Sequence, residues 1–511
     1  MQENKKMLGA VKKITLNTFF LYMRQIINIF VSLYTVRVVL KVLGTGDYGI
    51  YNVVAGIVAT LGFINNSMSN ASQRYFSFEI GKNTNGLSKI FSMTILSYIG
   101  IIIVIVLLSE SIGLWYVSRK MIFPEGRGCA AVLSFQCVII TFVFSFMSSP
   151  FMALIISNEN MFVFSVVSVF ESVAKLIMTV FLTKVNFDKL VLYSFLMIFP
   201  AAISFFIYML FCFFKYKNVS LIKYWNWKLI RDMSLYTISN LGGSIINIFK
   251  IQVLNVFINQ KFSSKIVAAR GIATNISGII QSFSINFSTA ISPFVTKQFA
   301  QDRKRDLCDF LILSCKISYF INFIIGLPAF LEMDYLLKLW LKIPPEYSVV
   351  FSKLVIVDCC IDSLTLPLMV GIQATGKISK YVFSMSAFNL LYLPVCLILF
   401  HFGFNPTSAL VVSPVFTFIS IFIRIFYISK NMDYKLVGLV LKILIPVVFV
   451  SVISFFTMFA FTEIFVQSFI RLFGTTVVSV IVNAILILLF GLNKNERISV
   501  FSKIKAKLER N

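Results

Sequence analysis

The sequence predicts an all-α membrane protein of about 14 transmembrane helices, arranged as two parallel six-helix repeats with two extra C-terminal helices. Three observations lead to this fold class. Apolar residues make up 58% of the 511 residues and charged residues only 13%, whereas soluble domains average about a quarter charged residues. Apolar runs of about twenty residues, long enough to cross a bilayer as helices, recur along the chain. Finally, the two halves of the chain share sequence blocks in the same order.

The spans are expected wherever such an apolar run occurs. Their expected starts are Ile14, Tyr48, Ile90, Ala130, Met161, Leu190, Met233, Ile266, Leu307, Val349, Lys380, Thr407, Val437 and Phe473. The first run follows a short lysine-containing leader. Because this run is too long for the core of a signal peptide, we expect it to remain as the first span.

The internal repeat rests on three pairs of matching segments about 220 residues apart. IINIF recurs unchanged, the pattern GI-x5-GI recurs downstream of it, and a proline-containing segment recurs further on. These pairs are Ile26–Phe30 with Ile245–Phe249, Gly49–Ile57 with Gly271–Ile279, and Ser149–Ser165 with Leu366–Ser384. We interpret them as an internal duplication of six spans, which makes the two halves parallel repeats. Repeats of this kind in an apolar chain are typical of transporters.

Basic residues indicate the orientation of the chain, because lysine and arginine concentrate in cytoplasmic loops. The basic clusters are Lys215, Lys217, Lys223, Lys228 and Arg231; Lys297, Arg303, Lys304 and Arg305; and Lys494, Arg497, Lys503, Lys505, Lys507 and Arg510. All three fall on one side if both termini are cytoplasmic.

The expected domain organisation follows from the spans and the repeat. It consists of an N-terminal six-helix lobe (1–214), a cytoplasmic interfacial linker (215–232), a C-terminal six-helix lobe (233–429), helices 13 and 14 (430–492) and a basic cytoplasmic tail (493–511). Trp225 and Trp227 lie among lysines, so the segment Leu221–Met233 is expected to form an interfacial amphipathic helix.

Several functional classes are disfavoured. The net charge of +25 lies mostly in the predicted inner loops, where orientation and anionic lipids explain it without nucleic acid. The eight cysteines show no metal-ligand spacing and are interpreted as small apolar fillers. No nucleophile elbow, phosphate-binding glycine loop or histidine pair is present. The sequence therefore predicts neither an enzyme nor a metal or cofactor site.

Charges inside spans are energetically costly and usually line a cavity or form pairs. Arg24 lies about 15 Å into the first span by helical rise, and Lys250 lies at comparable depth in the seventh. In the repeat alignment Lys250 falls seven residues beyond Arg24, on the same helix face and about 10 Å away in height. We expect these two faces to be opposed across the pseudo-twofold axis. The candidate substrate-binding residues are Arg24, Lys250, Arg270, Asn28 and Asn247. For Arg270, which is nearer the outer surface, snorkelling is the alternative.

Four further buried charges are candidates for ion coupling. Glu171 and Lys175 are an i,i+4 pair, for which a structural role and a role in the cavity both stay open. Asp358 and Asp362 are also i,i+4 but have like charge. Two carboxylates in low dielectric do not both ionise unless a cation lies nearby. Either a cation from another span neutralises them or one stays protonated, as a site coupled to H⁺ or Na⁺ would require.

Two patterns predict local geometry. Glycines spaced by seven residues are expected to permit close helix contacts, and prolines inside spans are expected to mark bends. The glycines are Gly49, Gly56, Gly271 and Gly278, and the prolines are Pro150, Pro293 and Pro367.

The stretch LGTGDYGIYN (Leu43–Asn52) follows the basic-led first span, and Pro-x-Met segments occur at Pro150 and Pro367. Together with the fourteen spans and the six-plus-six duplication, these features resemble Wzx-type polysaccharide flippases, which handle O-antigen or capsule repeat units. These flippases belong to the multidrug/oligosaccharidyl-lipid/polysaccharide exporter (MOP) superfamily. The resemblance covers essentially the whole chain and is strongest through residues 24–89.

The resemblance implies two six-helix lobes around a central cavity, in a bacterial inner membrane. The implied cargo is an undecaprenyl-diphosphate-linked oligosaccharide, moved from the cytoplasmic to the periplasmic leaflet by alternating access. Its cationic cavity residues would correspond to Arg24, Lys250 and Arg270. Membrane lipids, H⁺ or Na⁺ as coupling ion and a polysaccharide polymerase are the partners expected.

Three alternatives stay open. A cation-coupled multidrug antiporter of the same superfamily needs acids facing its cavity, and spans 1, 2, 7 and 8 have none in their interiors. A membrane polymerase or ligase for lipid-linked sugars usually needs a large outer loop, and the outer connections are modest. A flippase for lipid II is the third alternative.

Overall fold

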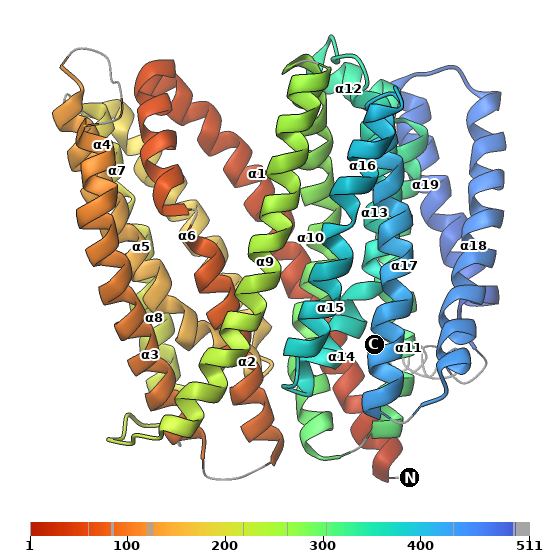
Figure 1. Cartoon of the computed structure of the whole chain (residues 1–511), viewed down its shortest axis with the longest axis horizontal. Coiled ribbons are helices and arrows are strands. Elements are labelled where there is room, and N and C mark those ends of the chain that lie inside the picture. The colour runs from red at the N-terminus through yellow and green to blue at the C-terminus, as the bar shows by residue number, and fades with distance from the viewer. Residues whose placement is uncertain are drawn as a thin grey trace, which may run out of the picture. The chain divides into compact units, whose positions relative to one another are not determined.

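The computed structural model describes residues 2–59, 61–82, 86–119, 121, 126–185, 187–217, 219–262, 264–302, 304–432, 434–493 and 496. All regular secondary structure in this part of the chain is helical, which confirms the predicted fold class (Figure 1). Eleven helical segments are long and apolar enough to cross a membrane. The protein is therefore a multi-pass membrane protein. Apart from Asn493 and Glu496, the predicted tail 493–511 lies outside the described residues.

Three of the fourteen expected spans are helical but more polar than the other eleven. They are the part of α1 after Gly44 together with α2 (Gly62–Lys82), α9 (Trp227–Lys261) and α10 (Ser264–Ala300). With 35 and 37 residues, α9 and α10 are long enough to cross a bilayer. The count of about fourteen spans is therefore consistent with the structure. These three helices correspond to spans 2, 7 and 8. Spans 2 and 8 contain the repeated GI-x5-GI motif, span 7 contains Lys250, and span 8 also contains Arg270.

Helix α1 (Gln2–Ala59) is divided by a kink at Gly44, whose φ of 73° and ψ of 174° are not helical. A side chain at this φ would be strained, whereas glycine has no β-carbon to clash. The first glycine of LGTGDYGIYN thus ends the first span and allows the chain to begin the second.

One compact unit of the chain comprises Val11–Leu241. After α1 and α2 its helices are α3 (Leu87–Leu108), a π-helical turn (Ser109–Gly113), α4 (Leu114–Arg119), α5 (Gly128–Ser157), α6 (Met161–Phe181), α7 (Lys189–Leu196) and α8 (Ile198–Lys215). Apolar clusters hold this unit together, among them two that involve α5. One joins Val54, Phe135 and Leu190, and the other surrounds Phe91 and Leu154. Their burial provides the packing that fixes α5 at the centre of the unit.

The other unit comprises Gly242–Asn511 and Met1–Ala10, and the division from the first unit falls inside α9. Its further helices are α10, α11 (Lys304–Leu331), α12 (Met333–Leu341), α13 (Ser348–Ser363), α14 (Thr365–Ala374), α15 (Ser379–Leu390), α16 (Tyr392–His401), α17 (Thr407–Met432), α18 (Leu436–Ile464) and α19 (Phe469–Leu486), which continues as a π-helical turn (Ile487–Gly491). The interfacial helix expected over Leu221–Met233 begins only at Trp227, because Leu221–Asn226 is not helical.

The helix packing inside one unit repeats inside the other. In the first unit α5 packs against α2, α3 and α8, and α8 packs against α6. In the other, α13 and α14 pack against α10, α11 and α17, and α17 packs against α15 and α16. The packed pairs are the same in both units when each span of the first unit is matched to the span six places later in the chain. The contacts thus agree with the duplication inferred from the sequence.

Helix breaks fall at Met197, Leu364 and Leu391, each three residues before a proline. Proline has no amide hydrogen and its ring clashes with the carbonyl one turn earlier, which interrupts the helix there. Pro367 is one of these three prolines, as expected. Pro150 and Pro293 instead lie inside the continuous helices α5 and α10.

The four glycines expected to permit close helix contacts do not do so. A β-carbon at Gly49, Gly56, Gly271 or Gly278 would have no neighbouring heavy atom within 4 Å among the described residues. A close approach occurs instead at Gly371 of α14. A β-carbon there would lie 2.6 Å from Cδ1 of Leu311 and 2.9 Å from Cδ1 of Ile428. Gly371 thus lets α14 pack directly on α11 and α17.

Gly371→Ala is expected to destabilise the protein by about 1–3 kcal/mol, because the added methyl group overpacks a filled contact. Thermal unfolding in detergent, followed with a thiol-reactive dye, measures the change because seven of the eight cysteines are not exposed. Gly474→Ala on α19 is the matched control, because a β-carbon at Gly474 meets nothing within 4 Å. Equal melting temperatures of the two variants would contradict the expected overpacking.

Two buried ion pairs attach the appended helices to the repeat. Arg471 of α19 donates from Nε and Nη2 to the two carboxylate oxygens of Glu332, at 2.8 and 2.9 Å. Lys316 of α11 is fully buried, and its Nζ lies 3.0 and 2.9 Å from the carboxylate oxygens of Glu496. These pairs join residues 139 and 180 positions apart, so periodicity could not predict them. They place α19 and Glu496 against α11.

Candidate functional site

Arg24 lies beside an aromatic ring of another span in the unit Val11–Leu241. Its guanidinium carbon is 4.5 Å from the ring centroid of Phe164 on α6. Tyr208 of α8 completes this site by donating its hydroxyl to the Phe164 carbonyl at 3.3 Å. A guanidinium over an aromatic face is stabilised by about 2 kcal/mol when desolvated. Arg24 of α1 is therefore held against α6.

The same face of α6 contains further polar residues of the predicted site. Ser168 accepts a hydrogen bond from the Asn28 amide at 3.2 Å, which connects α6 to α1. Glu171 accepts one from Lys175 at 2.6 Å. One face of α6 contains Phe164, Ser168, Glu171 and Lys175 at helical spacing. The last three therefore form a polar stripe beside the Phe164 ring. Glu171 and Lys175 satisfy each other, as the structural alternative for this pair requires.

Lys250 occupies a corresponding position in the other unit. Its Nζ lies 4.9 Å from the ring centroid of Tyr392 on α16. The Tyr392 hydroxyl donates to the carbonyl of Ala409 at 2.8 Å and so fixes the ring. Asn247, one turn earlier on α9, is exposed. Lys250 is thus restrained by an aromatic face, as Arg24 is.

The two cation–ring contacts use equivalent spans. Arg24 and Phe164 lie on spans 1 and 5, and Lys250 and Tyr392 lie on spans 7 and 11. Lys250 is seven residues further along its repeat than Arg24. Tyr392 is nine residues beyond Phe383, the repeat equivalent of Phe164. Lys250 and Tyr392 are therefore displaced in the same direction from the repeat positions of Arg24 and Phe164, by about 10 and 14 Å of helical rise. The second unit thus has the same kind of cation–ring contact at a different height along the helices.

The two carboxylates on α13 have different partners. Asp358 accepts hydrogen bonds from the hydroxyls of Ser413 at 2.7 Å and Thr417 at 2.5 Å, both on α17. Asp362 accepts one from Thr365 at 2.8 Å, and its Oδ1 lies 3.9 Å from a guanidinium nitrogen of Arg424. Arg424 thus supplies the cation from another span that like-charged carboxylates require.

Sequence analysis did not single out Arg424, although an arginine inside the apolar run of span 12 could have indicated it. The Arg424 side chain is 12% exposed. It donates to the Tyr381 hydroxyl at 2.9 Å and to Ser420 at 3.0 Å. Lys250 is also close enough to Asp358 and Asp362 to interact electrostatically with both. Two acids and two cations therefore form one network inside this unit.

Arg270 connects α10 to α9 rather than extending from the end of its span. Its Nη1 donates to the side-chain oxygen of Asn255 and, at 3.4 Å, to the carbonyl of Ile251. Asn255 lies five residues beyond Lys250 on α9. The structure therefore places Arg270 beside the helix that contains Lys250.

The aspartate of LGTGDYGIYN has a structural role. Asp47 forms an ion pair with Arg127, whose Nε donates to it at 2.8 Å. Arg127 also pairs with Asp188, the N-cap of α7, which accepts from the amides of Leu190 and Val191 at 3.0 and 3.2 Å. Arg127 thus joins the start of the second span to the start of α7.

Burial acts to raise the pKa of Asp188, but hydrogen bonds from the Val191 amide and Arg127 outweigh it, so this pKa lies below its usual value. This lowered pKa stabilises the folded protein above the pKa of an aspartate in the unfolded chain, about 3.9. The stabilisation is lost as the pH falls through the lower pKa of Asp188 in the folded protein. Asp188→Asn keeps the helix cap but removes the charge. We expect it to lower the melting temperature at pH 7, with a difference from the wild type that begins to shrink below about pH 4 and disappears below the lowered pKa of folded Asp188. Fluorimetry across pH 3–7 tests this, and a difference independent of pH would contradict it.

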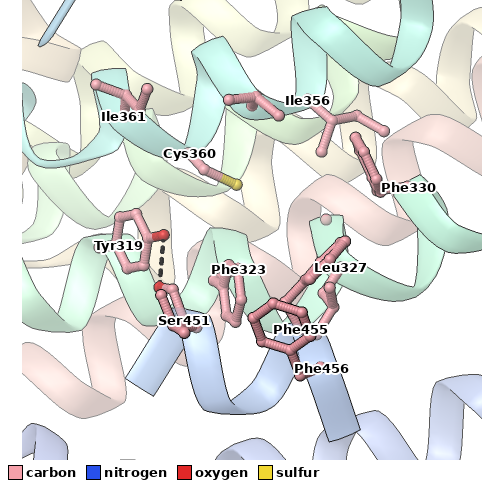
Figure 2. Close-up of a pocket in the computed structure, with 13 residues that line it drawn as sticks. Tyr319, Phe323, Leu327, Phe330, Ile356, Cys360, Ile361, Ser451, Phe455 and Phe456 are labelled. Carbon is pink, nitrogen blue, oxygen red and sulfur yellow. Dashed lines mark hydrogen bonds between the residues drawn. The ribbon is translucent and has the colours of Figure 1, made fainter. Parts of the chain in front are cut away.

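A crevice of about 280 Å³ lies between α11, α13 and α18 (Figure 2). Phe323, Cys360 and Phe455 are among its lining residues, and Tyr319 and Ser451 hydrogen-bond to each other across it at 2.8 Å. The lining is otherwise apolar, so this crevice suits hydrocarbon rather than a charged headgroup. None of the predicted site residues lines it.

The described residues contain no group of three or more histidine, cysteine, aspartate or glutamate side chains placed to hold a metal ion. The eight cysteines are free thiols, and only Cys129 is exposed. Most of them are thus buried apolar side chains, in agreement with their interpretation as fillers.

The repeated six-span units define the protein as an all-helical, multi-pass membrane protein. A model of the MatE family matches residues 241–398. This segment contains Lys250, Arg270, Asp358, Asp362 and Tyr392. No curated protein sequence matches the chain.

Solved structures of MATE transporters share this fold. An outward-facing multidrug resistance MATE family transporter of the MOP superfamily has a TM-score of 0.70 and 11% identity, and the match covers 82% of this chain and 95% of that one. The Vibrio cholerae MATE transporter VcmN in the bent form has a TM-score of 0.65 and 15% identity, covering 86% and 100%. A MATE structure in the bent conformation gives 0.70 and 11%, covering 83% and 97%. At these identities the likeness establishes the fold.

Proposed function

We propose that the protein is a flippase that moves undecaprenyl-diphosphate-linked oligosaccharide from the cytoplasmic to the periplasmic leaflet by alternating access, for surface polysaccharide synthesis. We place it in a bacterial inner membrane with both termini cytoplasmic. One observation supports this most directly. Each unit holds a cation within a membrane span against an aromatic ring, Arg24 on Phe164 and Lys250 on Tyr392.

This arrangement suits an anionic headgroup. A diphosphate with several sugars cannot cross about 30 Å of hydrocarbon unaided. An aromatic face restrains a cation without cancelling its charge. Arg24 can then bind phosphate oxygens in bidentate fashion, and Lys250 acts as a point charge. Asn28, Asn247 and Arg270 are assigned to the same cargo. The prenyl chain stays in the surrounding lipid.

The ion-coupling site in this proposal is Asp358 with Asp362. Arg424 keeps the charge of Asp362 compensated. Asp358 has hydroxyl donors and the nearby Lys250, so Asp358 is the carboxylate we assign to binding H⁺ or Na⁺. Glu171 with Lys175 is the candidate in the other unit, where the ion pair already satisfies both groups.

A cation-coupled multidrug exporter is the second candidate function. The similarity to a multidrug resistance transporter favours it, as do the acids Asp358 and Asp362. The charge of the cargo distinguishes the candidates. A cationic drug needs carboxylates at its binding site, such as Asp358 and Asp362 near Lys250, whereas a diphosphate needs cations such as Arg24 and Lys250.

Deletion of the gene followed by analysis of lipid-linked intermediates tests the proposal. A flippase predicts that a complete, unpolymerised oligosaccharide unit accumulates on the inner leaflet. A polymerase or ligase instead predicts accumulation on the outer leaflet. A drug exporter predicts hypersensitivity to cationic drugs with no accumulated intermediate, and that result would overturn the proposal. The composition of the accumulated unit identifies the sugars.

A further inference from the structure

The segment Ser220–Asn226 between α8 and α9, here called the strap, is ordered without being helical. The amide of Ser220 donates to the Ser88 hydroxyl at 3.2 Å, and the amide of Ile222 donates to the Ser92 hydroxyl at 2.9 Å. Both serines lie in the first turns of α3. The Tyr224 ring lies 5.3 Å from Nζ of Lys89. The strap is therefore fixed along one end of α3, and its outward side chains have a defined position.

The outward face of the strap combines large apolar rings with cations. Trp225 is 65% exposed and Trp227 68%, although indole rings are usually buried in proteins. Lys223 and Lys228 beside them are exposed. Tyr224 and Asn226, which alternate with these residues, are half-buried and hydrogen-bonded to each other at 3.0 Å. The alternation therefore places Lys223, Trp225 and Trp227 on one face, and Trp227 and Lys228 are the first residues of α9, which follows the strap.

The charge around the strap has a single sign. No aspartate or glutamate occurs between Lys215 and Arg231, and the first acid is Asp232. The cations in this stretch are Lys215, Lys217, Lys223, Lys228 and Arg231. The strap itself contains no carboxylate that could pair with these cations. Tryptophan rings prefer the depth of lipid headgroups, and clustered lysines attract anionic lipid.

We propose that the strap is a binding surface for the anionic phospholipid headgroups of the adjacent leaflet. The lysine ammonium groups contact headgroup phosphates, and the two indole rings lie at the boundary between headgroups and acyl chains. This inference does not depend on the identity of the cargo.

Lipid binding at the strap would position α9. Asn226 ends the strap and accepts the Leu229 amide at 3.2 Å, so it caps the first turn of α9. The same helix contains Lys250. Holding the strap against the leaflet therefore fixes the start of the helix that contains one of the two proposed cargo cations. Anionic lipid is expected to regulate transport through this attachment.

Fluorescence quenching by brominated lipids tests the proposal directly. The chain has four tryptophans, so Trp115→Phe with Trp340→Phe leaves only the strap pair as reporters. The protein is reconstituted in nanodiscs at equal mole fractions of phosphatidylglycerol and phosphatidylcholine, with one lipid brominated at a time. We expect brominated phosphatidylglycerol to quench at least about twofold more, and the preference to decline with added salt.

Two variants complete the test. Lys223→Gln with Lys228→Gln is expected to remove the preference, whereas Lys184→Gln with Lys189→Gln makes the same charge change between α6 and α7 and is expected to retain it. Melting curves verify that both variants are folded. Equal quenching by the two lipids in the parent protein would overturn the proposal and point to an acidic protein segment as the occupant. A preference that is unchanged by salt and by the strap variant would also overturn it.

Discussion

Arg24→Glu and Lys250→Glu are each expected to reduce export of the lipid-linked oligosaccharide about a hundredfold or more, while the protein still inserts. Each substitution removes a charge-assisted interaction with phosphate, worth about 1.5–3 kcal/mol, and adds repulsion between two anions. A loss of about 3 kcal/mol corresponds to about a hundredfold. Each cation lies against an aromatic ring, so the effect should appear in either unit separately.

Conservative substitutions provide the matched controls for this prediction. Lys250→Arg and Arg24→Lys keep the positive charge and are expected to retain part of the export. Arg24→Lys is expected to be the more impaired, because lysine cannot replace bidentate contacts. Surface polysaccharide on cells and flipping into proteoliposomes provide the measurements. Normal surface polysaccharide in both charge-reversal variants, at wild-type protein levels, would remove the assignment of these residues to the cargo.

Arg471→Met is expected to destabilise the protein by about 3–5 kcal/mol, the largest stability effect we predict. The substitution leaves the carboxylate of Glu332 without its two guanidinium hydrogen bonds. The Glu332 side chain is fully buried, so water cannot replace that partner. Because this pair attaches α19 to the repeat, we expect α19 to separate from α11 before the rest of the unit unfolds.

Thermal unfolding in detergent and hydrogen exchange over α19 measure this effect. Lys353→Met is the control, because its pair with Asp334 at 3.3 Å is more exposed and such pairs contribute about 0–1 kcal/mol. Adding Glu332→Gln to Arg471→Met removes the uncompensated charge and should restore part of the stability. Equal melting of the Arg471 and Lys353 variants would show that the buried pair does not stabilise α19.

Much of the fold was predictable because bilayer thickness sets the length of apolar runs. Met161 and Thr407 are helix starts in both the sequence analysis and the structure. The duplication was visible because IINIF recurs at matching positions. The unexpected glycine result has a simple cause. Spacing indicates a shared helix face, but it does not indicate whether another helix lies against that face, as one does at Gly371.

The candidate site was predictable only where a single residue is informative by itself. Arg24 and Lys250 stand out because a charge inside an apolar run is rare and costly. Their aromatic partners were not predictable, since many phenylalanines and tyrosines occupy the spans. Arg424 was missed, although its position inside the apolar run of span 12 could have indicated it. Its importance depends on Asp362, which lies on another helix.

By itself, the sequence determined the all-helical membrane class, the approximate number of spans and the internal repeat. These properties follow from composition, helical rise and local order along the chain, and need no knowledge of neighbouring helices. Only the tertiary structure decided which charges are neutralised and which lie against a ring, as with Lys316 on Glu496 and Lys250 on Tyr392. Such pairings join residues far apart in the sequence, and they depend on which helix faces pack together.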